Sequence, residues 1–482
     1  MLVSVVERAP LTDPLAALEA VERAALSDRA LAGQVAAGRT YWTRPADGFA
    51  LAAVGAAAEL AGEGVGRFEA VARAWAALRD DATVDDPSDG APGAGPVLVG
   101  GFAFAPEGPR AAHWRGFPSA LLTLPRLQIA VQGAACWTTT NLLVGEDGRP
   151  DVDPAVLARL RAAAVGARTA ARNGAGAAPR NGAAPGALAV ADVIPAAAWR
   201  ATVGDAVRSV RAGAFEKVVL ARAVHAAAAR LGADDSVANG SDSGTAGGRA
   251  FDVGSALRHL RAAHPDCYVF ACWRGDGAFV GASPERLVRL DGRDVRASSL
   301  AGSAPRGATP EEDAARAAAL LASAKDRAEH EVVRRVLCAG LGELCDDVIA
   351  PAAPSLLTLG NVHHLLTAVR ARLRPGHSLL DLIARLHPTP AVGGAPREAA
   401  LQFLRAREQL DRGWYAAPVG WVGRDGGEFA VGLRSALVRG GEAWLFAGCG
   451  VVADSDPDAE YAESLLKLRP MEQALAAGLG GQ

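Results

Sequence analysis

The stretch that decides the fold is EFAVGLRSALVRGGEAWLFAGCGVV, at residues 428–452. It contains two apolar runs, at 428–438 and 443–452, and the length and composition of each predict a strand. Alternate side chains of a strand point to opposite faces, so in the first run larger apolar residues take one face and small residues share the other with Arg434. A guanidinium among small residues has room above it for a planar carboxylate. We therefore interpret Arg434 as a candidate carboxylate-binding residue.

The sequence on either side of this stretch also contains strands and helices. Strands are predicted at 96–104, 120–131, 215–224, 267–273 and 278–283, and helices at 311–341 and 458–476. This order of elements favours a mixed α/β or α+β fold with sizeable, largely antiparallel sheets.

Two segments lack the pattern of packed structure. Residues 166–190 are rich in Gly, Ala, Pro and Asn and predict a flexible linker or long loop, and residues 231–250 predict a flexible surface insertion. The first segment separates an N-terminal part, 1–165, from a C-terminal region, 191–482. The length of 482 residues by itself allows two or three domains. All the candidate chemistry lies in the C-terminal region.

Composition and charge exclude several classes of protein. The net charge of -3 offers no basic surface for nucleic acid or an anionic membrane. No apolar run is long enough to span a bilayer, and the N-terminus has no signal-peptide pattern, so we expect a cytoplasmic protein. The six cysteines form no CxxC or other metal-ligand spacing, and we expect them to be reduced and mostly buried.

The most informative signal is a set of charged residues on faces that otherwise look buried. Lys217 shares one face of the strand at 215–224 with Phe215, Val219 and Ala221. A lysine in an apolar face loses hydration, which favours the neutral form that accepts protons in base chemistry. The same pattern also fits an edge strand whose lysine reaches solvent.

Both predicted helices carry acidic residues of this kind. Glu329 lies within the apolar stripe of the first helix, where its carboxylate needs a partner, either a bound cation or Lys325 one turn earlier. On the last helix, Glu460, Glu463 and Lys467 fall at i, i+3 and i+7 and share one face. The last two also have the i,i+4 spacing of an ordinary solvated ion pair.

Glycines complete the pattern in the strand at 443–452. Gly448 and Gly450 would let backbone N–H groups approach an anion closely. Together with the residues above, they give an acidic pair suited to Mg²⁺, two cations suited to carboxylates and a candidate buried lysine. This combination predicts a small dianionic substrate with a metal, and it does not identify the substrate.

Ten stretches of the chain, in this order, resemble the chorismate-utilising enzymes. This family contains isochorismate synthases, salicylate synthases and the aminating subunits of anthranilate and aminodeoxychorismate synthases. The stretches are FEKVVLAR, GASPERLVRL, SLAGSAPRG, SAKDRAEHE, NVHHLLT, LHPTPAVGGAP, RGWYAAPVGW, EFAVGLRSA, AGCGVV and EYAESLLKL. They run from about Pro195 to Met471, and the N-terminal third matches only at GGFAFAP. The resemblance implies one α+β unit with two large, mainly antiparallel sheets and outer helices, to which the N-terminal third contributes strands.

The resemblance also implies catalytic and metal-binding residues. Lys217 would be the general base and Glu285, at a turn after a strand, the general acid, although Glu285 alone also fits an exposed turn carboxylate. Glu329 and Glu463 would bind Mg²⁺, Glu460 would help through a water, and the metal would hold the ring carboxylate of chorismate.

The same resemblance implies a substrate-binding set. Arg434, Lys467 and the backbone of Gly448 and Gly450 would bind the pyruvyl carboxylate, with Tyr415 nearby. His364 and Thr367 would border the ring hydroxyl and side chain, and Gly302 and Ser303 would border the ring carboxylate. Ala391 also belongs to this substrate-binding set.

Three positions indicate which member of the family this is. Isochorismate synthases have a lysine like Lys217 that deprotonates a water, whereas the aminating enzymes usually lack it. Ala301 stands where some aminodeoxychorismate synthases have a nucleophilic lysine, and Ala391 stands where aminating enzymes and salicylate synthases commonly have threonine. Val392, where leucine is more usual, is a conservative departure. We therefore predict an isochorismate synthase, which adds water at C2 of chorismate and removes the C4 hydroxyl.

Alternatives and partners follow from the same comparison. Salicylate synthase, which makes the same intermediate and then eliminates pyruvate, is the first alternative, and anthranilate synthase component I is the second. A catalytically silent homologue is a third, against which the intact set of candidate residues argues. We expect chorismate as substrate, Mg²⁺ as cofactor, no nucleic acid or membrane partner, no glutamine amidotransferase subunit, and a monomer. Whether the product feeds menaquinone, siderophore or salicylate synthesis depends on neighbouring enzymes.

Overall fold

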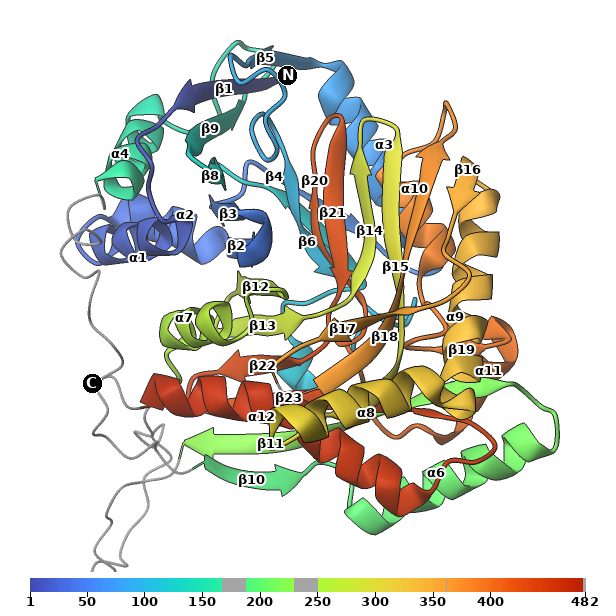
Figure 1. Cartoon of the computed structure of the whole chain (residues 1–482). Coiled ribbons are helices and arrows are strands. Elements are labelled where there is room, and N and C mark those ends of the chain that lie inside the picture. The colour runs from blue at the N-terminus through green and yellow to red at the C-terminus, as the bar shows by residue number, and fades with distance from the viewer. Residues whose placement is uncertain (167–187, 229–249, 361, 480–482) are drawn as a thin grey trace, which may run out of the picture.

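Two large β-sheets form the centre of the protein (Figure 1). The computed structural model describes residues 1–166, 188–228, 250–360 and 362–479. Most of the predicted linker at 166–190 and of the predicted insertion at 231–250 lies outside the described residues.

The larger sheet contains 13 strands. Every pairing between them is antiparallel except that of its last two members, which are parallel. In spatial order the strands are β10 (Leu188–Asp192), β11 (Lys217–Ala228), β23 (Glu442–Val451), β22 (Ser435–Arg439), β13 (Gly277–Ser283), β12 (Tyr268–Arg274), β2 (Arg39–Arg44), β3 (Phe49–Val54), β8 (Leu127–Gln132), β9 (Ala135–Leu143), β1 (Leu2–Arg8) and β5 (Ala82–Asp85), with β19 (Gly394–Ala395) paired to β11.

The smaller sheet contains 10 strands and is antiparallel throughout. Its strands in spatial order are β16 (Cys345–Ile349), β18 (Val362–Leu373), β15 (Asp294–Pro305), β14 (Arg286–Asp291), β21 (Gly426–Val431), β20 (Pro418–Val422), β6 (Leu98–Phe102), β7 (Ala120–Leu124) and β4 (Ala58–Gly62), with β17 (Ser355–Thr358) paired to β18.

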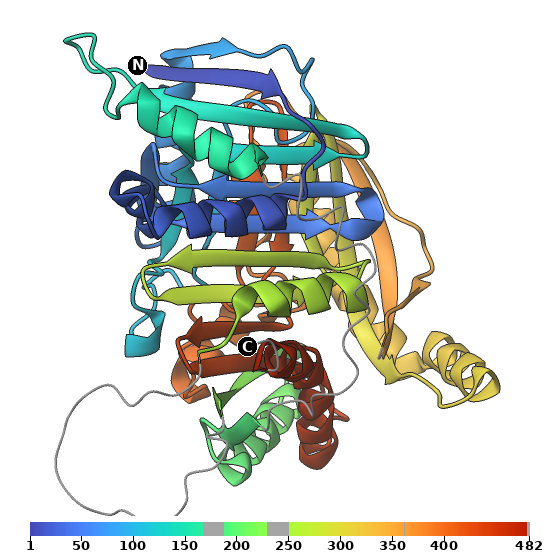
Figure 2. The same ribbon diagram turned by 90° about the vertical axis from the view of Figure 1, so that its left-hand side faces the viewer.

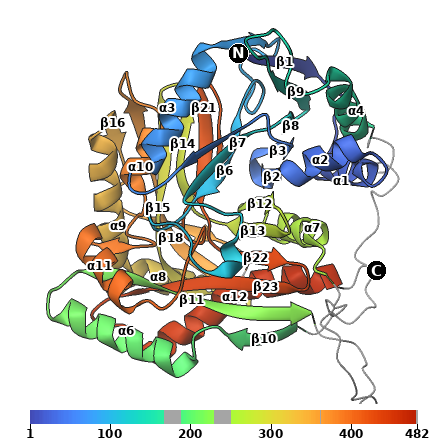
Figure 3. The ribbon, with the colours of Figure 1, turned by 180° about the vertical axis from the view of Figure 1, so that it is seen from behind.

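Helices cover the outer faces of both sheets. The larger sheet carries α1 (Pro14–Ala25), α2 (Arg29–Ala37), α4 (Pro154–Val165), α7 (Val253–Ala263) and α12 (Pro457–Leu479), which are seen face-on in Figure 2. The smaller sheet carries α3 (Arg67–Asp80), α9 (Ala324–Gly342) and α10 (Leu379–Leu386), seen from behind in Figure 3. The remaining helices α6 (Ala196–Arg211), α8 (Pro310–Ala322) and α11 (Arg397–Arg407) contact β11, β15 and β19, respectively.

Aromatic side chains fill the space between the two sheets. Phe49 of β3 packs on Trp421 of β20 with ring centroids 5.4 Å apart. Trp42 and Phe270 from the larger sheet belong to the same buried cluster as Phe102 from the smaller one. Because strands from the first 143 residues enter both sheets, the N-terminal part and the C-terminal region share this core.

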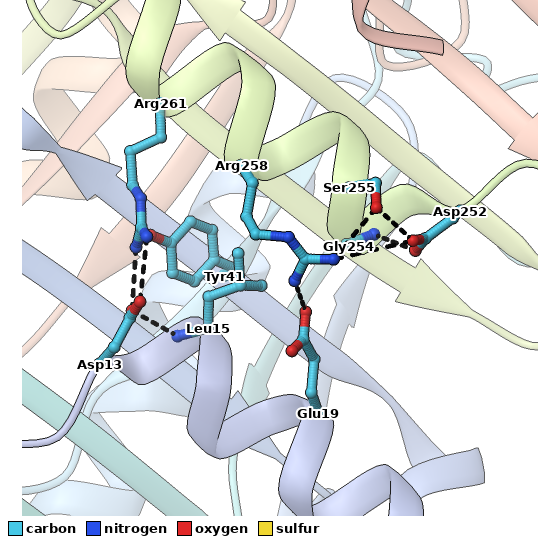
Figure 4. A network of polar contacts seen from close by, with 9 residues as sticks. All are labelled: Asp13, Leu15, Glu19, Tyr41, Asp252, Gly254, Ser255, Arg258 and Arg261. Atoms are coloured by element: carbon cyan, nitrogen blue, oxygen red, sulfur yellow. Dashed lines mark hydrogen bonds and ion pairs between the residues drawn. The ribbon is translucent and has the colours of Figure 1, made fainter. Parts of the chain in front are cut away.

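A polar network also joins α1 to α7 (Figure 4). Arg261 donates hydrogen bonds of 2.9 and 3.0 Å to the carboxylate of Asp13, which precedes α1, and one of 3.2 Å to the hydroxyl of Tyr41. Arg258, one turn earlier on α7, pairs with Glu19 of α1. These contacts hold the first helix of the chain against the region that carries the candidate site.

The stretch at 428–438 is not one strand, so this prediction was wrong. β21 ends in the smaller sheet and β22 begins in the larger one, so the chain crosses between the sheets at residues 432–434. Arg434 has a φ of 48°, in the left-handed region, so its backbone is not extended. The alternation of side chains between two faces, from which we predicted the position of Arg434, therefore stops at this residue. Nearly all residues on both sides of the crossover are buried, so hydrophobic alternation did not reveal it. The predicted strand at 120–131 is divided between the sheets in the same way.

The predicted helix at 311–341 is also divided, into α8 and α9, at Ser323. The Ser323 hydroxyl accepts a hydrogen bond of 3.2 Å from the Asp326 N–H and donates one of 2.5 Å to the Asp326 carboxylate, so it caps a new helix. Leu321, which was expected in a continuous apolar stripe, is 38% exposed. The remaining predicted strands and the last helix are confirmed.

Within the described part of the chain, no helix combines the length and the apolar character that a membrane crossing requires. All six cysteines are free, and all but Cys338 are buried, as predicted.

Candidate active site

One cavity of about 290 Å³ gathers nearly all of the predicted site residues. The predicted residues that line it are Lys217, Glu285, Gly302, Ser303, Glu329, His364, Ala391, Tyr415, Arg434, Gly448, Gly450, Glu460, Glu463 and Lys467. Thr367 is the exception, because its buried hydroxyl forms a hydrogen bond of 2.8 Å with Nε2 of His330 and it does not line the cavity.

Two crossovers between the sheets place Glu285 and Arg434 in this cavity. Glu285 lies between β13 of the larger sheet and β14 of the smaller one, and Arg434 lies between β21 and β22. Hydrogen bonds join the crossovers: the Val431 N–H donates to the Glu285 carbonyl at 3.0 Å, and the Ala282 N–H donates to the Arg434 carbonyl at 3.1 Å. Each side chain therefore enters the cavity from irregular backbone that the other crossover holds in place.

Lys217 lies on an internal strand and is 2% exposed, which excludes the edge-strand interpretation. Its ammonium lies 2.8 Å from Oε1 of Glu329 on α9. A Cβ on Gly450 would lie 2.8 Å from that oxygen and 2.8 Å from Cε of Lys217, so glycine makes room for the pair. The alternative partner proposed for Glu329, Lys325, is therefore wrong.

Glu285 has the protonation state of a general acid. It is 3% exposed, so it is not the exposed turn carboxylate of the alternative interpretation. Burial raises the pKa of its carboxyl to about 8, against the opposing charge of Lys217. A carboxyl with this pKa is mostly protonated at neutral pH and can donate a proton.

The first turns of α12 provide the acidic wall of the cavity. Burial and the neighbouring Glu463 raise the pKa of Glu460 to about 7, and the Ser455 hydroxyl donates a hydrogen bond of 2.8 Å to its carboxylate. Carboxylate oxygens of Glu460 and Glu463 and the thiol of Cys449 all lie within 4.8 Å of one another. Cys449 does not line the cavity, and burial raises the pKa of its thiol well above the usual range, so it is a poor ligand for a hard cation.

These donors fit Mg²⁺. The ion prefers carboxylate oxygens, and the three predicted ligands, Glu329, Glu460 and Glu463, are among the acidic residues that line the cavity. A divalent cation would also offset the repulsion that raises the pKa of Glu460. The oxygen of Glu329 contacts Lys217 rather than the other two carboxylates.

Lys467 supplies a permanent positive charge beside this wall. Its ammonium lies 2.8 Å from Glu463 and donates a hydrogen bond of 2.9 Å to the Gly448 carbonyl. Burial by itself would lower the pKa of Lys467, but the Glu463 carboxylate holds it above its usual value. The i,i+4 pair expected from the sequence is present, and both of its members line the cavity.

His364 is a neutral imidazole that faces Arg434. Burial, reinforced by the Arg434 charge, lowers its pKa to about 3. Its Nε2 lies 3.5 Å from Nη2 of Arg434, which can only donate, so the ring proton is on Nδ1, 3.2 Å from the Gly302 carbonyl and 3.0 Å from the Ser303 hydroxyl. Burial also raises the pKa of Tyr415 well above its usual range, so its hydroxyl keeps its proton and can donate into the cavity.

The sequence interpretation missed Arg412, which is 4% exposed and lines the cavity. Its guanidinium pairs with Glu408 at 2.5 Å and donates hydrogen bonds of 2.8 Å to the Val392 carbonyl and 2.6 Å to the Val219 carbonyl. Glu408 in turn accepts a hydrogen bond of 2.9 Å from the Ala221 N–H. The pair, which we call the Glu408–Arg412 clamp, ties the strand of the candidate base to the loop that contains Ala391. The sequence shows that Glu408 and Arg412 have opposite charges four residues apart, but it does not show that the pair is buried.

Lys325 and Asp326 were also missed as lining residues. Lys325 precedes Glu329 by one turn of α9, and this spacing could have identified it. Its place at the cavity depends on the separate helix α9, which begins at Ala324 after the Ser323 cap.

Comparisons with known proteins show the family of this chain. The family model described as chorismate binding enzyme matches residues 1–239 and 244–476. The salicylate biosynthesis isochorismate synthase of Pseudomonas aeruginosa is 41% identical over 443 residues, which cover 92% of this chain and 85% of that protein. The isochorismate synthase MenF of Bacillus subtilis is 36% identical over 384 residues, which cover 79% of this chain and 75% of that protein.

A solved structure has the same fold over nearly the whole length. It is that of MenF, the menaquinone-specific isochorismate synthase from Escherichia coli, with a TM-score of 0.72 and 23% identity over 98% of this chain and 95% of that one. The family model and the structural match both include the N-terminal third, where the sequence resemblance was weak. This chain belongs to the chorismate-binding enzyme family.

Proposed function

We propose that this chain is an isochorismate synthase that converts chorismate to isochorismate with Mg²⁺ as cofactor. The observation that carries the proposal is the presence in one cavity of a buried lysine, Lys217, and of a carboxyl, Glu285, whose pKa is raised to about 8. These two groups supply the base and the acid that the reaction needs. The two relatives described above are isochorismate synthases by name and support the same reaction.

In the proposed reaction, Lys217 first releases its ammonium proton to solvent, and the neutral amine then takes a proton from the water that attacks C2 of chorismate. Glu285 donates its proton to the C4 hydroxyl as that hydroxyl leaves. Glu329, Glu460 and Glu463 would hold Mg²⁺, which supplies positive charge beside the ring carboxylate. Arg434 and Lys467 would bind the pyruvyl carboxylate. His364 and Tyr415, which are both uncharged, would form hydrogen bonds with the bound substrate.

Two alanines support water as the nucleophile. Ala391 and Ala301 both line the cavity, so neither the threonine of aminating relatives nor a nucleophilic lysine stands at these positions. We therefore propose that the protein acts on chorismate without a glutamine amidotransferase subunit. We also propose that the protein acts in the cytoplasm as a monomer.

The decisive experiment is incubation of the purified protein with chorismate and Mg²⁺, with and without ammonium, followed by identification of the products. Isochorismate without release of pyruvate supports the proposal. Salicylate with pyruvate, an amine that depends on ammonium, or no turnover of chorismate would each overturn it.

A variant tests the assignment of the base. We expect Lys217→Ala to lower the rate by roughly 10²–10⁴-fold, the usual contribution of a general base, while chorismate still binds. Arg316→Ala, which removes an Arg from α8 outside the cavity, is the control and should leave the rate unchanged. Near-normal turnover in Lys217→Ala would exclude this lysine as the base.

A further inference from the structure

Lysine occurs in this chain only at the active-site cavity. Of 50 basic residues, three are lysines, Lys217, Lys325 and Lys467. All three line the cavity, and arginine takes every basic position outside it. A surface cation that supplies only charge can be either residue, whereas a compact ammonium with a flexible stem differs from a planar guanidinium in what it can contact. The distribution therefore points to a specific role for each lysine, and two of them have one in the proposed function.

Lys325 is the lysine without an assigned role. It is the second residue of α9, one turn before Glu329, and it is exposed at the cavity. The first turn of a helix carries partial positive charge and favours acidic rather than basic residues, so helix stability does not explain a lysine there. Within the described part of the chain its ammonium forms neither an ion pair nor a hydrogen bond with the protein.

The charges around the cavity show what Lys325 is free to bind. Three of the cations that line it pair with carboxylates at 2.8 Å or less: Lys217 with Glu329, Lys467 with Glu463 and Arg412 with Glu408. Arg434 faces the neutral ring of His364 instead. Among the described residues, Arg434 and Lys325 are thus the cations of the cavity that have no carboxylate partner.

We infer that Lys325 is a substrate-binding residue whose ammonium contacts the ring carboxylate of chorismate. The inference rests on the proposed function, because chorismate has two carboxylates and the cavity leaves two cations without a partner. In that function Arg434 and Lys467 bind the pyruvyl carboxylate, so Lys325 is the remaining side-chain cation for the ring carboxylate, beside which Mg²⁺ would also lie. The position of Lys325 one turn before Glu329 places it on the helix that carries a proposed metal ligand for the same carboxylate. Because the side chain is exposed, its ammonium can move to meet the substrate as it enters.

The test compares Lys325→Met with Arg327→Met. Both substitutions remove one positive charge from α9 at an exposed position, but Arg327 does not line the cavity. With saturating Mg²⁺, we expect Lys325→Met to raise the KM for chorismate about tenfold, the effect of losing one charged hydrogen bond, while kcat changes little. Arg327→Met should match the wild type, and Lys325→Arg should recover part of the loss because it restores the charge.

A binding measurement separates this inference from the proposed function. Calorimetric titration of chorismate into Lys217→Ala protein, without and with the added Lys325→Met or Arg327→Met change, needs no turnover. Weaker binding that is specific to Lys325→Met supports the inference, even if the wild type turns over no chorismate and the proposed function fails. Equal KM and equal binding in the two variants would overturn it, as would a fall in kcat alone or wild-type protein that binds no chorismate.

Discussion

The ammonium of Lys217 and the carboxylate of Glu329 form an ion pair of 2.8 Å against the backbone of Gly450. The side chains come from β11 and α9 and are 2% and 15% exposed, so the pair is largely shielded from water. It couples the proposed base to a proposed metal ligand within one contact. A substitution that separates Lys217 from Glu329 should therefore lower the rate of turnover more than it lowers the stability of the fold.

Gly450→Ala tests this contact. The added Cβ would lie 2.8 Å from both Oε1 of Glu329 and Cε of Lys217, and these are side-chain atoms that can move. We expect the variant to fold and to lose roughly 10²-fold or more in turnover, because the base is displaced. Steady-state rates with chorismate and a thermal unfolding curve would measure the two effects.

Gly33→Ala is the matched control for that variant. No atom lies within 4 Å of the position of its added Cβ, and Gly33 is inside α2. Alanine there should stabilise the helix by about 1 kcal/mol and leave turnover unchanged. If both alanine variants are fully active, the space over Gly450 is not needed for catalysis.

The pKa of about 8 at Glu285 predicts a fall of kcat/KM on the basic side of neutrality. The acid must hold a proton to donate it, so kcat/KM should decrease tenfold per pH unit once the pH exceeds that pKa. Glu285→Gln should lower the rate at all pH values and remove this limb from its residual activity. A wild-type profile that stays flat from roughly pH 6 to pH 10 contradicts the assignment.

The same carboxyl should make stability depend on pH. Folding raises its pKa from the ordinary 4.5 to about 8, so the folded protein keeps a proton that the unfolded chain releases between these values. The stability that the neutral Glu285 contributes is complete below pH 4.5 and is lost as the pH rises to about 8. Relative to Glu285→Gln, the wild type should therefore lose free energy of unfolding across this window, as urea denaturation at both ends would show. A constant difference between the two proteins would mean that Glu285 titrates normally.

Mg²⁺ should stabilise the protein through the carboxylates of α12. A ligand that binds only the folded state raises its stability by mass action, so the melting temperature should rise with Mg²⁺ concentration and fall again with EDTA. Glu463→Gln should abolish most of this response. Glu311→Gln, which alters an exposed acid in the first turn of α8, should keep it. Equal responses in the two variants would exclude Glu463 as a ligand.

The Glu408–Arg412 clamp should be needed for activity as well as for stability. Arg412→Met leaves a buried carboxylate without its partner, which typically costs about 3–5 kcal/mol. It also removes the hydrogen bonds that hold the carbonyls of Val219 and Val392. The double variant Glu408→Leu/Arg412→Met removes both charges and should recover much of the stability, as measured by urea unfolding. We expect the double variant to remain at least tenfold less active than the wild type. If its activity equals that of the wild type, the clamp does not position the site.

The sequence predicted most strands and the last helix correctly, but it did not predict where the chain crosses between the sheets. Local alternation and apolar runs placed β11, β12, β13, β23 and α12 correctly, because these patterns report which side chains are buried. The same patterns ran through residues 432–434 and through Ser323 without a break. A strand that changes sheets stays buried on both sides of the change, and a serine inside a helical pattern can equally cap a second helix.

By itself, the sequence determined the family and most of the helices and strands that carry the candidate site residues. Only the tertiary structure decided which groups meet. It showed that Glu329 pairs with Lys217 and not with Lys325, that Thr367 turns away from the cavity, and that Arg434 stands on a crossover rather than in a strand. The physical reason is that periodicity assigns a side chain to a face of its own element, whereas its partner comes from a distant segment whose position depends on the packing of both sheets.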